Sequence, residues 1–229
     1  MSNKVLVVAA HPDDEVLGCG GTIARHADEG EEVHVLIVAE GATSRLQHRD
    51  RTQVKNELLS LAKAAEIAGS ILGAASVNLL NLPDNRLDSL DRLDLIKTIE
   101  EHLNDYMPQI VYLHHAGDVN IDHRRLHEAV VTACRPTPNQ PVRQLLSFEV
   151  ASSTEWQPPG SALTFQPNWF VDISAQWKRK REALLAYSSE MRAWPHSRSL
   201  EAVEHLARWR GSQVGVEAAE AFTLLRQLI

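Results

Sequence analysis

The 229-residue sequence predicts an α/β fold with a mostly parallel sheet, helices on both faces of that sheet and added structure in the C-terminal third. Short apolar runs rich in Val, Ile and Leu alternate with longer segments of helical periodicity, which is typical of βαβ units. The runs are continuously apolar, as expected for strands buried on both faces of a parallel sheet. Because no repeat, low-complexity tract or long linker divides the chain, we expect a single domain over residues 1–229.

The first half of the chain shows this alternation most clearly. Strands are predicted at residues 4–10, 33–39, 76–80 and 109–113. Helices are predicted at residues 22–29, 51–68 and 89–103. Gly30 and Gly69 follow the first two helices, where glycine commonly ends a helix.

The second half begins with a polar loop after residue 113, which leads into a helix ending near Cys134. Two further strands are predicted at residues 145–150 and 169–173. Three further helices are predicted at residues 175–187, 200–210 and 216–225. Cys19 and Cys134 lie in apolar helical sequence, so we expect buried free thiols and no disulfide framework.

Composition excludes several classes of protein. A net charge of −7 is a poor match for phosphate backbones, so we expect no nucleic-acid partner. The longest apolar run, Val5–Ala10, is far shorter than the ~20 residues of a membrane span. This run ends in Pro-Asp-Asp-Glu, without a small-residue cleavage site, and so predicts a first strand rather than a signal peptide. We therefore expect a cytoplasmic protein without a membrane span, and a homo-oligomer is compatible with the sequence.

Polar sequence follows two of the predicted strands at the point where each strand ends. The segment His11–Glu15 comes directly after the first strand, and Asp118–His123 follows the fourth. Ligands of α/β sheets bind outside the carboxyl ends of the strands. Catalytic zinc commonly takes three ligands from His and carboxylate side chains. His11, one of the two adjacent aspartates and His123 are candidates for these ligands, and the other aspartate for a base that takes a proton from water.

Each of these segments has a plainer explanation when it is considered alone. A single His is more often a hydrogen-bonded loop or core residue, and Pro-Asp-Asp-Glu is also a turn followed by a helix cap, with Glu15 at the cap. The glycines at 18, 20 and 21 do not have the G-x-G-x-x-G spacing of a dinucleotide site, and the acidic segment beside them would repel phosphates. The functional explanation becomes stronger when the two segments are considered together, because both follow the carboxyl ends of predicted strands.

The sequence Ala-His-Pro-Asp-Asp-Glu at residues 10–15 resembles the signature of the PIG-L / LmbE-like deacetylases, and residues 122–124 resemble the second signature of that family. Weaker similarities extend to residues 189–199 and 211–222. The resemblance implies a Rossmann-like fold and a zinc-dependent hydrolase that removes the acetyl group from an N-acetylated amino sugar or sugar conjugate. It further implies a zinc ion, or another divalent ion such as Fe²⁺, bound by His11, Asp14 and His123, with Asp13 as the general base that activates the zinc-bound water.

The sequence departs from that family in its second signature. Many members carry His-x-x-His, whereas this chain has Asn120 at the first position. An Asn side chain can donate a hydrogen bond to an oxyanion, but it cannot protonate the departing amine. His196, His114 and His115 are the candidates for that acid. We favour His196, with Asp122 as the carboxylate that orients it.

Several residues are expected to contact the substrate. Asp84 and Arg86 lie in a loop after the third strand, at the same edge of the sheet, and His114 and His115 end the fourth strand. Trp156 and Trp194 flank Pro-rich loops, where an indole could stack on a sugar, although burial in the core is the default for Trp.

Three functional hypotheses remain open. The first is N-deacetylation of an amino sugar or its conjugate, and the second is N-deacylation of a non-sugar amide such as a secondary-metabolite intermediate. The third is a metal- or sugar-binding protein without turnover. The complete set of His11, Asp13, Asp14 and His123 argues against the third, because a binding protein has no use for a base beside the metal.

Overall fold

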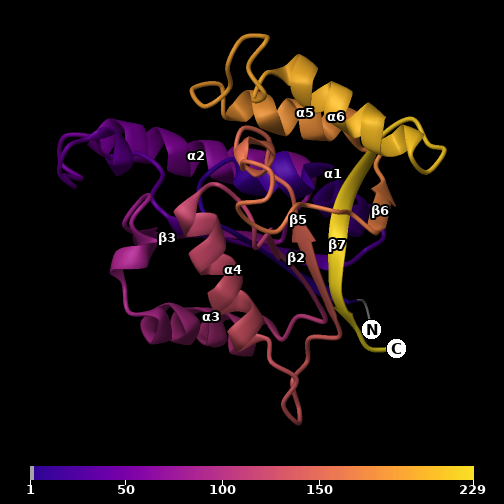
Figure 1. Cartoon of the computed structure of the whole chain (residues 1–229), viewed down its shortest axis with the longest axis horizontal. Helices are drawn as coiled ribbons and strands as arrows, with labels where there is room; N and C mark the ends of the chain where they lie inside the picture. The colour runs from indigo at the N-terminus through magenta and orange to yellow at the C-terminus, as the bar shows by residue number, and fades with distance from the viewer. Residues whose placement is uncertain (1–2) are drawn as a thin grey trace.

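The computed structural model describes residues 3–229, which form a seven-stranded sheet between layers of helices (Figure 1). The strands are β1 (Lys4–Ala9), β2 (Glu32–Ala39), β3 (Ser76–Leu82), β4 (Ile110–His114), β5 (Gln144–Phe148), β6 (Trp169–Asp172) and β7 (Ala219–Gln227). They lie in the order β3-β2-β1-β4-β5-β7-β6. The first five strands pair in parallel, and β7 is antiparallel to both of its neighbours. The predicted fold class is confirmed.

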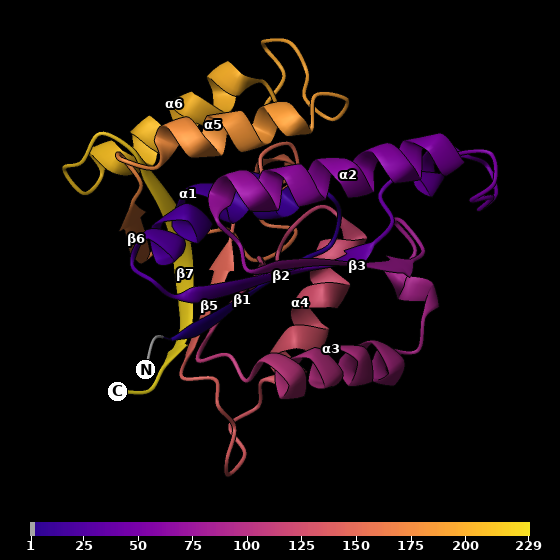
Figure 2. The same ribbon diagram turned by 180° about the vertical axis from the view of Figure 1, so that it is seen from behind.

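Helices cover both faces of the sheet, as predicted (Figure 2). They are α1 (Asp14–Asp28), α2 (Lys55–Leu72), α3 (Arg92–Tyr106), α4 (Ile121–Ala133), α5 (Trp177–Ala186) and α6 (Leu200–Ser212). Side chains of β1 alternate between the two faces: Val5 and Val7 pack with α1, α2 and α5, whereas Leu6 and Val8 pack with α3 and α4. Because both faces are buried, the strand is continuously apolar, which is why the sequence identified it.

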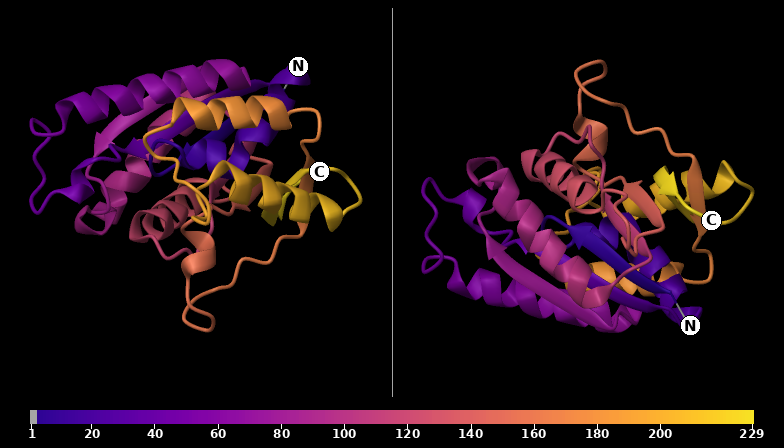
Figure 3. Two further views of the ribbon diagram at one scale, coloured as in Figure 1. Left: turned by 90° about the horizontal axis from the view of Figure 1, so that it is seen from above. Right: turned by 90° about the horizontal axis from the view of Figure 1, so that it is seen from below.

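The remaining segments are irregular or form short 3₁₀ turns. These turns are η1 (Thr43–Arg45), η2 (Leu87–Ser89) and η3 (Thr154–Trp156). The segment between β5 and β6 projects from the body of the molecule in both views of Figure 3. Both cysteines are buried and free, as predicted. Within residues 3–229 the structure contains no helix with the length and apolar character needed to cross a membrane.

Two predicted helices have different bounds. The first begins at Asp14 and not near residue 22, because glycines taken for a turn lie inside it. A Cβ atom on Gly21 would lie 2.6 Å from Ile173, so these glycines allow close packing of the helix. The second continues through Gly69 and ends at Gly73, whose φ of 82° is the left-handed conformation that glycine adopts freely.

The predicted helix at residues 216–225 is wrong, since residues 219–225 lie in β7. Its pattern of apolar residues fits either structure, and the choice is made by distant partners: β7 lies between β5 and β6. Pairing along β5 runs from Gln144 opposite Gln227 to Phe148 opposite Phe222. Such pairing cannot be seen in local periodicity.

A buried ion pair attaches this C-terminal strand to α1. Lys180 Nζ lies 2.6 Å from Glu220 Oε1 and donates to the carbonyl of Leu17 at 2.8 Å. The Glu220 carboxylate accepts the backbone N–H groups of Gly21 at 2.8 Å and Thr22 at 2.7 Å. In a regular helix the N–H of Gly21 would reach the carbonyl of Leu17. Glu220 therefore binds the N–H of Gly21 and Lys180 binds the carbonyl of Leu17, and the ion pair links the C-terminal third to α1.

Glu220→Ala is expected to lower the free energy of unfolding by about 3–5 kcal/mol, because it leaves the Lys180 ammonium buried without its partner. Urea denaturation measures this change. Glu66→Ala, at an exposed position of α2, is the control and should change the stability by less than about 0.5 kcal/mol. Equal stability of the two variants would contradict the structural role of the ion pair.

Candidate functional site

The candidate site lies where the order of the strands reverses. β1 pairs with β2 on one side and with β4 on the other, so the connections that leave β1 and β4 run in opposite directions along the sheet. Such a position is where ligands bind in open α/β sheets. His11 and Asp14 follow β1, and His123 lies in the first turn of α4, after β4. The structure thus brings together the two polar segments that the sequence identified.

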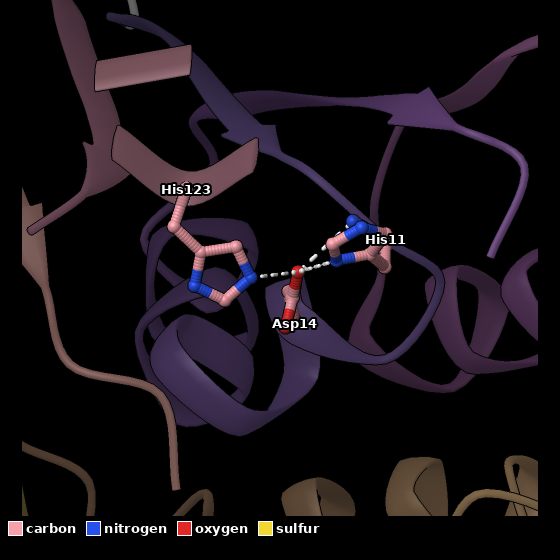
Figure 4. Close-up of side chains that lie close together, drawn as sticks. All are labelled: His11, Asp14 and His123. Atoms are coloured by element: carbon pink, nitrogen blue, oxygen red, sulfur yellow. Dashed lines mark hydrogen bonds and ion pairs between the residues drawn. The ribbon is translucent and has the colours of Figure 1, made fainter. Parts of the chain in front are cut away.

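Three candidate metal ligands meet at one carboxylate oxygen. Asp14 Oδ2 lies 3.2 Å from His11 Nδ1 and 3.1 Å from His123 Nε2. Figure 4 shows both imidazole rings directed at this carboxylate. The three ligand atoms lie within 4.8 Å of one another. This spacing suits atoms that share one ion, since zinc binds His and carboxylate ligands at about 2.0–2.2 Å.

The remaining nitrogen of each histidine faces a buried carboxylate. His11 Nε2 lies 3.1 Å from Asp122 Oδ2 and 3.3 Å from Asp84 Oδ1. His123 Nδ1 lies 3.2 Å from Asp118 Oδ2. Such partners fix the tautomer and ring orientation of metal-binding histidines. With an ion bound to the nitrogen directed at Asp14, each ring would carry its proton on the other nitrogen, which faces the outer carboxylate.

This arrangement fits a metal ion. His123 Nε2 is buried and makes no hydrogen bond of acceptable geometry within residues 3–229. An unpaired buried nitrogen costs free energy, and coordination of a cation would remove that cost. Two imidazoles and one carboxylate are also the donor set of many catalytic zinc sites.

The charged groups of the site shift one another's pKa values. Burial favours the neutral form of Asp14, but the nearby His123 and His11 lower its pKa well below the usual range. Burial likewise opposes protonation of His123, but Asp14 and Asp118 raise its pKa to about 9. Asp14 is therefore ionised, as a metal ligand must be.

Arg198 and Glu15 hold Asp13 directly, and Tyr187 holds Glu15. The carboxylate Oδ2 of Asp13 accepts a hydrogen bond from Arg198 Nη1 at 2.9 Å. Its backbone N–H donates to Glu15 Oε2 at 3.1 Å, and Glu15 Oε1 accepts from the Tyr187 hydroxyl at 2.6 Å. Burial raises the pKa of Asp13, and the positive charge of Arg198 opposes this rise.

The backbone of Asp13 is strained. Its φ of 109° and ψ of −27° lie outside the regions that non-glycine residues favour. Such a conformation costs about 1–3 kcal/mol and persists only where surrounding contacts impose it. The bonds of Glu15 and Arg198 provide those contacts. Glu15 was expected at a helix cap, and its carboxylate does bind the backbone N–H of Asp13, which is the N-cap residue of α1.

The sequence did not identify Arg198. Within residues 189–199, which resemble the family, His196 was favoured instead. The structure directs Arg198 into the cavity, where Nε also donates to Ser152 Oγ at 3.0 Å. His196 is not among the residues that line the cavity: its Nδ1 accepts the backbone N–H of Arg198 at 3.0 Å, and its ring packs against Trp156. The signal in the sequence that could have identified Arg198 was its position two residues after His196.

The other predicted acids are also engaged elsewhere. His114 Nε2 accepts the backbone N–H of Ala10 at 2.8 Å, its ring stacks on His123, and burial lowers its pKa well below the usual value. His115 Nε2 donates to the carbonyl of Leu163 at 2.8 Å. Neither lines the cavity. Asp122, expected to orient His196, instead orients His11.

The remaining predicted residues divide into two groups. Asn120 and Asp84 line the cavity. Asn120 caps α4, with Oδ1 accepting the N–H of Asp122 at 2.8 Å, which leaves its amide N–H groups without a partner within residues 3–229. Arg86 is not among the lining residues.

The cavity has a volume of about 150 Å³ and is strongly polar. It is lined by His11, Pro12, Asp13, Asp14, Gly41, Ser44, Arg45, Asp84, Asn85, Asn120, His123, Ser152, Ser153, Glu190 and Arg198. Arg45 and Glu190, from distant parts of the chain, form an ion pair at 2.8 Å among these lining residues. The site can hold a metal ion, a base beside it and a small polar substrate.

The chain is similar to known proteins over most of its length. The family model PIG-L, described as GlcNAc-PI de-N-acetylase, matches residues 6–134. The diacetylchitobiose deacetylase of Thermococcus kodakarensis is 30% identical over 202 residues, covering 82% of this chain and 70% of that protein. The 4-oxalmesaconate hydratase of Pseudomonas putida is 25% identical over 205 residues, covering 84% of this chain and 76% of that protein. The crystal structure of the conserved protein TT1542 from Thermus thermophilus has a TM-score of 0.76 at 26% identity, covering 99% of this chain and 96% of that one.

His11→Ala, Asp14→Ala and His123→Ala should each lose most of the bound metal after loading with zinc and gel filtration, because each removes one of three protein ligands. Asp118→Asn should keep the ligands but bind zinc about 10–100-fold more weakly, because His123 loses its orienting carboxylate. Elemental analysis and zinc titration measure these effects. His115→Ala is the control and should bind zinc like the wild type. Full zinc content in all three ligand variants would exclude this site.

Proposed function

The chain belongs to the PIG-L family, and on that premise we propose that it is a metal-dependent N-deacetylase that removes the acetyl group from an amino sugar or sugar conjugate. The observation that carries this proposal is that two adjacent aspartates have different partners. Asp14 lies between two histidines with oriented rings, and Asp13 is held apart by Arg198. Metal binding and proton transfer would thus use separate carboxylates, which suits metal-assisted hydrolysis of an amide.

His11, Asp14 and His123 would hold the ion, for which we propose zinc, with Fe²⁺ as a further candidate. When bound, such an ion polarises a carbonyl oxygen and lowers the pKa of water. The protein supplies the orientation of its ligands through Asp118, Asp122 and Asp84.

Asp13 would act as the general base. Arg198 binds Oδ2, so Oδ1 has no hydrogen-bond partner within residues 3–229 and can take a proton from the attacking water. The amide N–H of Asn120 would stabilise the negative charge that develops on the carbonyl oxygen.

The departing amine also needs a proton. We propose that Asp13 delivers the proton that it took from water, because the three candidate histidines do not line the cavity. His196, favoured from the sequence, remains the rival donor, since its Nε2 makes no hydrogen bond within residues 3–229.

The other hypotheses receive less support. A binding protein without turnover would have no use for the strained backbone of Asp13 or its ion pair with Arg198. A non-sugar amide fits the same catalytic groups, and the hydratase among the relatives shows that similar sequences do not all have deacetylase names. Substrate screening must therefore include non-sugar amides and an unsaturated carboxylate, with N-acetylated sugars as the arm that we expect to react.

The proposal predicts that the zinc-loaded protein releases acetate and a free amine from N-acetylglucosamine derivatives. Asp13→Asn should retain zinc but lose about 10²–10⁴-fold in kcat, because an amide cannot accept the proton of water. Amine release and metal content are measured on the same samples. Asp88→Asn, at an exposed position, is the control. Wild-type turnover in Asp13→Asn would assign the base to another residue, and hydration of the unsaturated acid without amide cleavage would overturn the proposed function.

Two variants of one loop separate the role of Arg198 from that of His196. Arg198→Gln should lower kcat by up to about 10²-fold with zinc retained, because Asp13 loses its fixed orientation. Added guanidinium ion should restore part of this activity by occupying the vacated position. His196→Ala should keep a kcat close to that of the wild type. A large loss of kcat in His196→Ala with zinc retained would make His196 the acid instead.

A further inference from the structure

A second concave surface lies beside the catalytic cavity. This Trp194 groove has a volume of about 340 Å³, more than twice that of the cavity. It is lined by Glu149, Val150, Ala151, Glu155, Trp194, Pro195, Ser197, Ala202, His205 and Leu206. Most of these side chains are apolar, in contrast to the polar cavity.

The groove and the cavity share two stretches of chain. Ala151 lines the groove and the next residue, Ser152, lines the cavity. Ser197 lines the groove and the next residue, Arg198, lines the cavity. Consecutive Cα atoms are about 3.8 Å apart, so the two spaces are separated by little more than one residue on each side. The hydrogen bond of 3.0 Å from Arg198 Nε to Ser152 Oγ joins these two stretches.

The charged side chains of the groove are already paired. Glu149 binds Arg210 at 2.7 Å. Glu155 accepts the backbone N–H groups of Ser152 at 2.7 Å and Ser153 at 3.3 Å. The groove thus offers no unpaired carboxylate to a cationic ligand.

Trp194 gives the groove an exposed aromatic wall. Its side chain is 58% exposed, and it meets the ring of His205 edge to face, at 5.6 Å between centroids. An exposed indole held in place loses little entropy when it covers an apolar ligand.

The catalytic cavity is too small for a whole substrate of ordinary size. Its volume of about 150 Å³ compares with about 300–1,000 Å³ for most small-molecule pockets. A substrate whose N-acetyl group reaches the three metal ligands must extend beyond the cavity, and the groove is the adjacent apolar surface.

We propose that the Trp194 groove binds an uncharged aryl or alkyl aglycone attached to the N-acetylated sugar. This inference rests on the proposed function for the position of the N-acetyl group. It specifies the substrate class: the enzyme prefers an apolar glycoside over the free sugar.

The first test compares kcat/KM for 4-nitrophenyl N-acetyl-β-D-glucosaminide with that for N-acetylglucosamine. The wild type should prefer the aryl glycoside, and Trp194→Ala should reduce this preference about tenfold, by loss of the aromatic contact. Trp209→Ala is the matched control, since Trp209 is 61% exposed and lies outside the groove. Its preference should equal that of the wild type. Equal preferences in all three proteins would overturn the proposal.

The second test does not depend on deacetylation. Calorimetric titration with 4-nitrophenyl β-D-glucoside, which has no amide, should show binding that Trp194→Ala weakens about tenfold and Trp209→Ala does not. This result with no amide hydrolysis would support the groove and contradict the proposed function. Amide hydrolysis together with glucoside binding that Trp194→Ala does not weaken would support the proposed function and contradict the groove. Self-association in sedimentation that Trp194→Ala abolishes would also overturn the proposal, because the groove would then be an interface between copies of the chain.

Discussion

The site depends on the orientation of two imidazole rings by buried carboxylates. Asp118 fixes His123, and Asp122 with Asp84 fixes His11, so that each ring directs its other nitrogen at Asp14. These carboxylates are themselves held by backbone groups: Asp122 accepts the N–H of Leu87 at 2.9 Å and that of Asn85 at 2.7 Å. The loop after β3 is thereby tied to the first turn of α4. The geometry at Asp14 is a property of the whole carboxyl edge of the sheet.

The C-terminal third supplies side chains that restrain the N-terminal signature at residues 10–15. Arg198 holds the side chain of Asp13, and Tyr187 holds Glu15, which binds the peptide of Asp13. The buried pair of Lys180 and Glu220 joins the same third of the chain to the middle of α1, the helix that begins at Asp14. The residues that would carry the chemistry therefore come from the first half. Arg198, which restrains the base directly, and Tyr187, which restrains it through Glu15, come from the second. The match to the family model ends at residue 134, before any of these restraining residues.

The sequence predicted what is determined locally. β1 is a continuous apolar run, as expected of a strand buried on both faces. The polar residues after it lie at the carboxyl edge of the sheet because they directly follow the end of the strand. The sequence failed where distant contacts decide. Residues 219–225 lie in a strand because they pair with β5 and β6. The glycines lie inside α1, where Gly21 allows Ile173 to pack closely against the helix. The sequence pattern pointed to the segment around His196 but not to Arg198, the side chain of that segment that contacts Asp13. The position of Arg198 depends on how the segment folds against Ser152.

The central claim is that the oriented histidines and Asp14 form a single metal site. An anomalous difference map, from crystals grown with one equivalent of zinc, tests it most directly. The account predicts one strong peak at about 2.0–2.2 Å from His11 Nδ1, Asp14 Oδ2 and His123 Nε2. A peak held instead by the surface group of His26, Glu29 and Glu31, which also places three potential ligands close together, would contradict it.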